Sequence, residues 1–299
     1  MRLLVLPVLT GLALLGGCAS TPVVPVSTAP AAAEAPASQQ PPADDSLNAT
    51  VWFQTSLERE LVYTAIYRAA GQRLDAALRD KRWDALTKED RNNDASKLPP
   101  AIIVDIDETV LDNSPASVRQ IRERRGFNEA AWAEWVNERR AKPLPGAAEF
   151  LNAAAAKGVT VFYISNRDAG LADATLANLR QAGFPIADDS QFLGLGAFVE
   201  GCEQHGSEKS CRRQLVARRY RVLMQFGDQV GDFVQILANT RDGRRAAITP
   251  YQAWIGERWW PLPNPLYGSW EPALFDNEWR QPEAARRAAK HAALDDARD

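Results

Sequence analysis

Short apolar runs that end on polar residues divide the middle of the chain. They are Ile102–Val104 before Asp105, Val159–Ile164 before Ser165 and Asn166, and Arg221–Phe226 before Gly227 and Asp228. Runs of this length are typical of strands buried on both faces of a parallel sheet. We therefore expect Asp228 to approach Asp105 from a neighbouring strand, at the edge where open sheets bind ligands.

Stretches with helical spacing alternate with these runs. They are Ser56–Leu78, two helices within 115–142 of which the second begins near Asn128, a helix between Pro145 and Gly158, Leu171–Gln181, and Leu215–Arg219. The alternation predicts an α/β fold with a doubly wound, mainly parallel sheet. The insertion at 115–142 follows the first strand, so it is expected to form a small helical cap over the strand ends. The polar stretch 90–96 is predicted to be a loop, and 259–270 a closing strand and turn.

The first residues have the pattern of an export signal. Arg2 precedes an apolar run from Leu3 to Leu15, which is too short for a membrane-spanning helix. The run ends on Leu-Gly-Gly-Cys, which resembles a bacterial lipobox and implies that Cys18 is lipidated. Because no Asp follows Cys18, outer-membrane sorting is expected, with the leaflet left open. The alternative is an ordinary signal peptide cleaved nearby.

Composition sets the other boundaries. Residues 19–46 are rich in Ala, Pro, Ser and Thr and predict a disordered tether after a signal peptide at 1–18. A globular domain is expected at 47–280, followed by a charged tail at 281–299 that forms either a solvated helix or a frayed end.

Charge and residue counts exclude several function classes. The net charge of -3 argues against binding of a nucleic-acid polymer, which needs a basic face. The chain has only two histidines in 299 residues, which argues against a His-rich zinc site and against a Ser-His-Asp catalytic triad. The oligomeric state is left open.

The sequence Asp105-x-Asp107-x-Thr109 directly follows the first strand. Carboxylates buried beside apolar residues are costly unless a cation or hydrogen bonds offset their charge, so we expect a divalent metal and a metal-assisted nucleophile. An ordinary acidic loop is the plain alternative. A calcium loop is excluded, because its sixth and twelfth positions would hold Val110 and Ala116 in place of Gly and Glu.

Two weaker signals accompany this motif. A hydroxyl and an amide at the end of the second strand, Ser165 and Asn166, suit phosphate oxygens, although the same pair is common in turns. Lys209 stands just before a predicted helix, and taken alone it is an ordinary solvated lysine.

In this order the motifs resemble the haloacid dehalogenase superfamily: Asp105-x-Asp107-x-Thr109, Ser165, Lys209, and Gly227-Asp228 with Asp232. The strings DIDETVLDNS, FYISNR, GDQVGDF and LPNPLYGSWE are similar to those of the class C acid phosphatases, secreted or outer-membrane lipoproteins that act as acid phosphatases and 5′-nucleotidases. The resemblance runs from about Leu47 to about Leu274. Gly231 departs from it, because some members carry an acidic residue there.

The resemblance implies a chemistry for the acidic residues. Asp105 would attack phosphorus and form an aspartyl-phosphate, and Asp107 would protonate the leaving oxygen and then deprotonate water. Mg²⁺ would be held by the Asp105 carboxylate, the Asp107 backbone carbonyl and the Asp228 carboxylate.

It also implies the groups that hold the phosphate. Ser165 and the Asn166 backbone would bind phosphate oxygens, and Lys209 would offset their negative charge. Asp232 would orient Lys209 or a metal-bound water.

Two further expectations concern substrate selectivity and the cysteines. Trp132 and Trp135 in the cap are either core residues or stack on an aromatic substrate group, Trp132 before Trp135, which would favour 5′-nucleotides and aryl phosphates. Export places Cys202 and Cys211 in an oxidising compartment, which predicts a disulfide that braces the Lys209 segment; two buried free thiols are the alternative.

The leading functional interpretation is a metal-dependent phosphomonoesterase acting on a small phosphomonoester. The alternatives are a lipid-anchored binding or storage protein on the same fold and a lipid-anchored structural protein. Retention of both Asp105 and Asp107 favours the enzyme.

Overall fold

The computed structural model describes residues 45–297. The predicted signal peptide, the lipidation site Cys18 and nearly all of the predicted tether lie outside this range. Within it, no helix is both long enough and apolar enough to cross a membrane.

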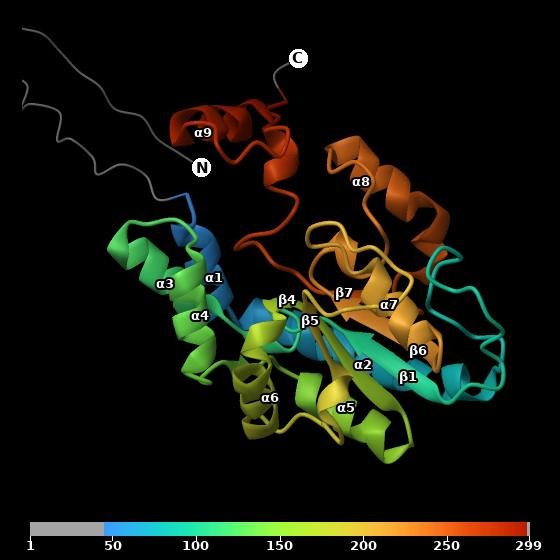
Figure 1. Cartoon of the computed structure of the whole chain (residues 1–299). Coiled ribbons are helices and arrows are strands. Elements are labelled where there is room, and N and C mark those ends of the chain that lie inside the picture. The colour runs from blue at the N-terminus through green and yellow to red at the C-terminus, as the bar shows by residue number, and fades with distance from the viewer. Residues whose placement is uncertain (1–44, 298–299) are drawn as a thin grey trace, which may run out of the picture. The chain divides into compact units, whose positions relative to one another are not determined.

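A five-stranded parallel sheet forms the centre of the described region, in the order β5-β4-β1-β6-β7 (Figure 1). Its strands are β1 (Pro100–Val104), β4 (Thr160–Asp168), β5 (Phe192–Leu195), β6 (Arg221–Gly227) and β7 (Trp259–Pro261). The central strand β1 pairs in parallel with β4 on one side and β6 on the other. The prediction of an α/β fold with a parallel sheet is confirmed.

Alternate residues of β1 face two separate hydrophobic cores, as expected for a strand buried on both faces. Ile102 and Val104 pack in the core that contains apolar residues of α2 (Leu57–Arg79), α5 (Ala147–Ala156) and α6 (Ala172–Gln181). Ala101 and Ile103 pack in the core that contains residues of α7 (Ser210–Ala217) and α8 (Arg241–Ile248). The sheet is therefore covered by helices on both faces.

The cap is built from more of the chain than the sequence indicates. A short antiparallel pair, β2 (Leu111–Asp112) and β3 (Lys142–Pro143), frames the insertion that carries α3 (Ser114–Glu123) and α4 (Glu129–Asn137). Asn128 caps α4 by accepting from the Ala131 amide. The unpredicted helix α1 (Leu47–Thr55) packs against α3, so the start of the folded region also belongs to the cap (Figure 1).

Three other elements differ from the prediction. Strand β4 continues through Ser165, Asn166 and Arg167 to Asp168, so these residues belong to the sheet. The edge strand β5, which has only four residues, and the helix α8, which has eight and contains a glycine, were missed. The C-terminal segment contains the helix α9 (Glu283–Ala292), which has no buried residue and corresponds to the solvated helix that was one of the two expectations.

The chain order places a ligand crevice between β1 and β6. From β1 the chain continues to β4 on one side of the sheet, whereas from β6 it continues to β7 on the other side. At such a switch point the connections diverge beyond the carboxyl ends of the two strands and leave a crevice. Asp105 and Asp228 follow these two strand ends.

Candidate active site

Helix α2 fixes the loop that follows β1. The Tyr63 hydroxyl donates to the Glu108 carbonyl at 2.6 Å, and the Tyr67 hydroxyl donates to the Thr109 carbonyl at 2.8 Å. Both rings are buried in the core between α2 and the sheet. The loop therefore rests on two rigid aromatic side chains, and Asp105 at its start is only 6% exposed.

Glu108 is the most constrained residue of this loop. It is fully buried and adopts a left-handed backbone with φ 55°, a conformation that costs free energy for a residue with a side chain. Its carboxylate accepts from the Asn113 amide at 2.7 Å and from the Tyr267 hydroxyl. Burial, and next the charge of Asp107, raise the pKa of Glu108 well above its usual range. No sequence motif had assigned this residue a role.

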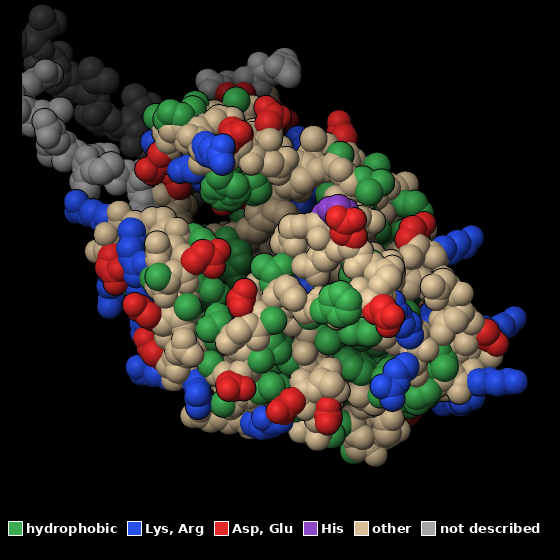
Figure 2. All heavy atoms as spheres, in the orientation of Figure 1, with side chains coloured by type: hydrophobic (Ala, Val, Ile, Leu, Met, Phe, Trp, Pro, Cys, Tyr) green, Lys and Arg blue, Asp and Glu red, His purple; other side chains and the backbone are tan. Residues whose placement is uncertain are grey.

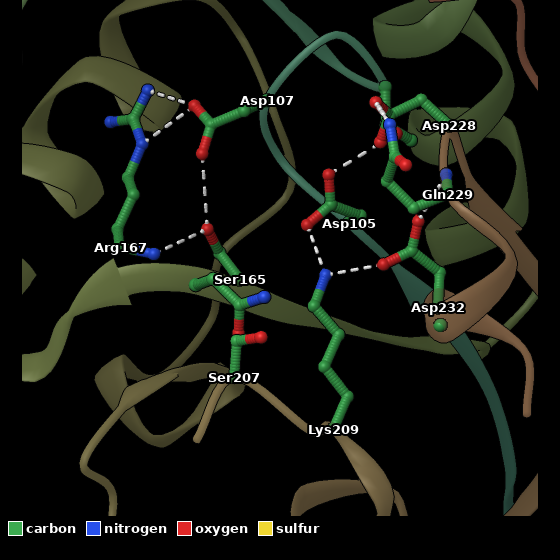
Figure 3. Close-up of polar contacts among 12 residues, drawn as sticks. Asp105, Asp107, Ser165, Arg167, Ser207, Lys209, Asp228, Gln229 and Asp232 are labelled. Carbon is green, nitrogen blue, oxygen red and sulfur yellow. Dashed lines mark hydrogen bonds and ion pairs between the residues drawn. The ribbon is translucent and has the colours of Figure 1, made fainter. Parts of the chain in front are cut away.

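Asp105, Asp228 and Asp232 form a cluster in which one carboxylate oxygen of each lies within 4.8 Å of the others (Figure 3). Burial raises the pKa of Asp105 to about 7, although Lys209 opposes the shift. Burial and repulsion from Asp232 and Asp105 raise the pKa of Asp228 well above its usual range. Buried oxygen donors whose charges repel one another suit a hard divalent cation, so the residues present fit a metal site.

Lys209 lies between two members of this cluster. Its Nζ contacts Asp105 Oδ1 at 2.5 Å and Asp232 Oδ1 at 2.6 Å. Burial lowers the pKa of Lys209, but the two carboxylates outweigh burial, and the net shift is upward. The other oxygen of Asp232 accepts from the Gln229 amide at 2.8 Å. Asp232 thus holds the lysine in place, one of the two roles that the resemblance implies.

Asp107 points to the other side of the loop, towards β4 (Figure 3). Arg167 binds its Oδ1 through Nε at 2.9 Å and Nη2 at 2.8 Å, and Asn113 Nδ2 binds the same oxygen at 2.8 Å. Its Oδ2 is contacted by the Ser165 hydroxyl at 3.3 Å. Ser165 and Arg167 are two residues apart on β4 and so share a face, a spacing that could have revealed Arg167.

Asn166 projects from the opposite face of β4. Its side-chain oxygen accepts from Arg212 Nη2 at 2.8 Å, and the residue lines the cavity that opens at these strand ends. The predicted contact between its backbone and phosphate stays a prediction.

This cavity has a volume of about 960 Å³. Its floor includes Asp105, Asp107 and Lys209, and its other walls come from the cap, the loop around Tyr267 and the C-terminal segment. Figure 2 shows the surface hollowed between the cap and α9. A cavity of this size is in the range typical of sites that bind small organic molecules.

Comparison with known proteins agrees with this geometry. The family model for the haloacid dehalogenase (HAD) superfamily, subfamily IIIB (acid phosphatase), matches residues 14–270. The chain belongs to this family. A class C acid phosphatase of Bacillus anthracis, solved with tungstate bound, is 33% identical, with a TM-score of 0.72 over 84% of this chain and 96% of that one. A second structure of the Bacillus anthracis enzyme matches equally well.

A plant protein gives a shorter match. The stem 31 kDa glycoprotein of soybean (Glycine max) is 30% identical over 171 residues. The match spans 55% of this chain and 58% of the soybean protein.

Two consecutive, fully buried arginines on α7, Arg212 and Arg213, hold the segments that carry the active-site residues of this acid phosphatase. Arg212 donates to the Ser165 carbonyl at 2.5 Å, at the end of β4. Arg213 pairs with Asp90 at 2.5 Å and donates to the Gly231 carbonyl at 2.9 Å, in the loop after β6. Asp90 was assigned to a polar loop, and neither arginine was predicted.

We expect Arg213→Lys to lower kcat on p-nitrophenyl phosphate about tenfold. Lysine keeps a charge for Asp90 but lacks the planar fork that also reaches Gly231, so Asp232 and Lys209 lose their alignment. The matched control is Arg221→Lys, another buried arginine that donates to the carbonyls of Ala77 and Asp80 at the opposite end of β6. Both variants should have a lower Tm than the parent. An equal fall in kcat in the two variants would contradict a positioning role for Arg213.

The cap aromatics differ from the prediction in one respect. Trp135 is 4% exposed, its Nε1 donates to Asn113 Oδ1 at 2.8 Å, and it does not line the cavity. A substrate-stacking role for Trp135 is therefore wrong, because the inner side of α4 packs on the Asn113 segment. Trp132 does line the cavity, with the Arg167 guanidinium 5.7 Å from its ring centre. Phe127, which is 62% exposed on the cavity wall, was missed.

Cys202 and Cys211 form a disulfide, with Cα atoms 5.6 Å apart. Cys211 is in the first turn of α7, two residues after Lys209. The bridge ties the loop after β5 to the helix that begins behind the lysine, which confirms the pairing expected from the sequence.

Proposed function

We propose that this chain is a metal-dependent phosphomonoesterase that acts through an aspartyl-phosphate on Asp105. The observation that carries the proposal is the buried Asp105 carboxylate, which faces the cavity between Lys209 on one side and Asp107 on the other. A nucleophile and an acid–base group on one rigid loop, backed by a fixed cation, are what stepwise phosphoryl transfer requires. The acid phosphatase family supports the same reaction class.

In the first step an Asp105 oxygen bonds to phosphorus while the bond from phosphorus to the ester oxygen breaks. Asp107 gives its proton to that departing oxygen, so the alcohol leaves neutral. Since Arg167 and Asn113 both bind Oδ1 of Asp107, Oδ2 is the oxygen that carries the proton. In the second step Asp107 takes a proton from water, the water oxygen bonds to phosphorus, and Asp105 is released.

We assign the binding of the phosphoryl oxygens to Lys209 and to Ser165, whose buried hydroxyl contacts Asp107 Oδ2 at 3.3 Å in this structure. Lys209 is already aligned by Asp105 and Asp232, so little reorganisation accompanies charge development. We assign Mg²⁺ to the Asp105 and Asp228 carboxylates and the Asp107 carbonyl. When bound, the ion would offset the repulsion between the Asp105 carboxylate and the phosphate dianion.

The test is hydrolysis of p-nitrophenyl phosphate by the purified protein with and without added Mg²⁺. Release of nitrophenol that depends on the metal supports the enzyme. Absence of turnover, combined with binding of phosphate esters, would instead support the binding or storage protein on the same fold.

For the substrate we propose 5′-nucleotides and aryl phosphates. The groups around Asp105 contact only the phosphate, so selectivity must come from the rest of the cavity. Its wall carries Phe127, Trp132 and Tyr267, more aromatic surface than a phosphate needs. Stacking of a base on one aromatic side chain contributes about 1–3 kcal/mol and tolerates any base.

We expect Phe127→Ala to lower kcat/KM for AMP and UMP by roughly fivefold to a hundredfold, the equivalent of one lost stacking contact. The value for glycerol phosphate should change little, because that substrate has no ring. Phe198→Ala is the control, since Phe198 is 87% exposed and does not line the cavity. Equal specificity constants for AMP and glycerol phosphate in the parent protein would exclude the nucleotide preference.

We further propose export and attachment to the outer membrane through a lipid on Cys18. The support is the short apolar run that ends on Leu-Gly-Gly-Cys, without an Asp after the cysteine. In a bacterial host, the parent should fractionate with outer membranes and Cys18→Ala should not. Membrane association that survives this substitution would exclude a lipid anchor at Cys18.

A further inference from the structure

The C-terminal segment forms the wall of the cavity farthest in sequence from the catalytic loop. Trp279 and Arg286 of this segment line the same cavity as Asp105 and Lys209. Both residues lie beyond residue 270, where the match to the family model ends. The proposed chemistry gives neither residue a task.

The positive charges that line the cavity differ in how far they are neutralised. Lys209 lies between Asp105 and Asp232, and Arg167 is held by Asp107. For Arg286, no ion pair to a carboxylate is present within the part of the chain that the structure describes. Its Nη1 donates to the Trp279 carbonyl at 2.9 Å, which leaves further N–H donors on the guanidinium.

Two other basic residues of the same helix are paired with carboxylates, and the acidic Glu283 of its first turn has no ion pair among the described residues. Arg287 pairs with Asp45 at 3.0 Å, and Lys290 pairs with Glu271 at 2.5 Å. Glu271 also lines the cavity, but its charge is offset by Lys290. Arg286 therefore adds a cationic group to this end of the cavity.

Trp279 holds the arginine in a defined place. Its ring packs edge-on against Phe275, which is 3% exposed, with ring centres 5.1 Å apart. The Arg286 guanidinium lies 5.5 Å from the centre of the Trp279 ring, and an aromatic face stabilises such a cation. The arginine is thus oriented by a half-exposed tryptophan that packs on Phe275, and no carboxylate within residues 45–297 pairs with it. An arginine presented in this way is suited to bind a phosphate or carboxylate through two parallel hydrogen bonds.

We propose that Arg286, oriented by Trp279, is a distal anion subsite that binds a second anionic group of the substrate while Asp105 attacks the first phosphate. This inference rests on the proposed phosphomonoesterase function. The substrate class it favours is a nucleotide-sized phosphomonoester that carries a second phosphate or carboxylate besides the phosphate that is cleaved. The cavity of about 960 Å³ has room for both groups at once.

The experiment compares AMP with adenosine 3′,5′-bisphosphate as substrates, with the products separated by chromatography. In the parent, kcat/KM for the bisphosphate should exceed that for AMP by about tenfold, a typical effect of one added charge-assisted contact. Arg286→Gln should remove this advantage through KM and change the value for AMP less than about twofold. The advantage should also shrink as salt is added, because the contact is electrostatic.

Arg287→Gln is the matched control, since it removes the same charge from the next position, which pairs with Asp45 instead. Equal treatment of the two substrates by the parent would overturn the subsite, as would an equal loss in the Arg286 and Arg287 variants. If p-nitrophenyl phosphate and both nucleotides are not hydrolysed at all, the proposed function fails by itself. Equilibrium dialysis of the bisphosphate against the same three proteins then decides the subsite.

Discussion

Replacing Asp105 by asparagine should abolish turnover of p-nitrophenyl phosphate, with a fall in kcat on the order of 10⁴ or more. An amide is a poor nucleophile and a weak ligand for a hard cation. The Asn oxygen could still accept from the Lys209 Nζ, which now contacts Asp105 at 2.5 Å, but it carries no charge, so Asp232 would be left as the charged partner of the lysine.

The same variant should remain folded. Burial raises the pKa of Asp105 to about 7, which shows that the folded protein disfavours the ionised carboxylate. Removing that charge relieves repulsion with Asp232 but also removes the ion pair with Lys209, so Tm should stay close to that of the parent. Circular dichroism melting separates this outcome from unfolding.

Asp84→Asn is the control, because Asp84 pairs with Arg91 at 2.5 Å and does not line the cavity. Its kcat should match the parent. Activity of Asp105→Asn within about tenfold of the parent, roughly 1.4 kcal/mol of barrier, would contradict a nucleophilic role.

The sequence predicts the centre of this site well, for a physical reason. Strands buried on both faces must be apolar, so a polar residue such as Asp105 or Asp228 marks where each strand ends. Parallel pairing then brings these ends to one edge. Lys209 is predicted as a site residue only because the other motifs occur in the same order, and the structure places it between Asp105 and Asp232.

The residues that support the site or line the cavity cannot be found from where apolar strands end. Arg213 and Asp90 are 123 positions apart, and no periodic pattern marks a buried ion pair between a loop and a helix. Phe127 precedes α4 and has no helical spacing to set its direction. Trp132 and Trp135 lie three residues apart on α4, so their periodicity alone cannot tell the residue that faces the cavity from the one that packs on Asn113.

The part of the cavity wall formed by the C-terminal segment could not be predicted from the sequence for a different reason. Helix α9 has no buried residue, and it is joined to the rest by ion pairs such as Lys290 to Glu271 and by the contacts of Arg286 with Trp279. Its apolar face consists of alanines alone, which bury little surface and give no sign of a core beneath them. Only the fold shows that it closes one end of the cavity.

Chelation should inactivate the protein and Mg²⁺ should restore it, and Asp228→Asn should raise the Mg²⁺ concentration for half-maximal activity by about a hundredfold. That factor is the loss of one charged ligand, roughly 2.7 kcal/mol. Asp228 is suited to this substitution because its Oδ2 accepts from Gln229 Nε2 and from Asn264 Nδ2, both at 2.7 Å. An amide oxygen can accept the same bonds, so the side chain should stay in place.

A readout apart from activity makes this prediction sharper. Burial and the repulsion from Asp232 and Asp105 raise the pKa of Asp228, so a bound cation should stabilise the folded state. A ligand at a hundred times its Kd adds about 2.7 kcal/mol to the free energy of unfolding. The Tm of the parent should therefore rise with Mg²⁺, and that of Asp228→Asn should rise only at much higher concentrations. Asp242→Asn, an exposed carboxylate on α8, should behave as the parent. Full activity after chelation, or the same Mg²⁺ dependence of Tm in Asp228→Asn, would show that no metal is held there.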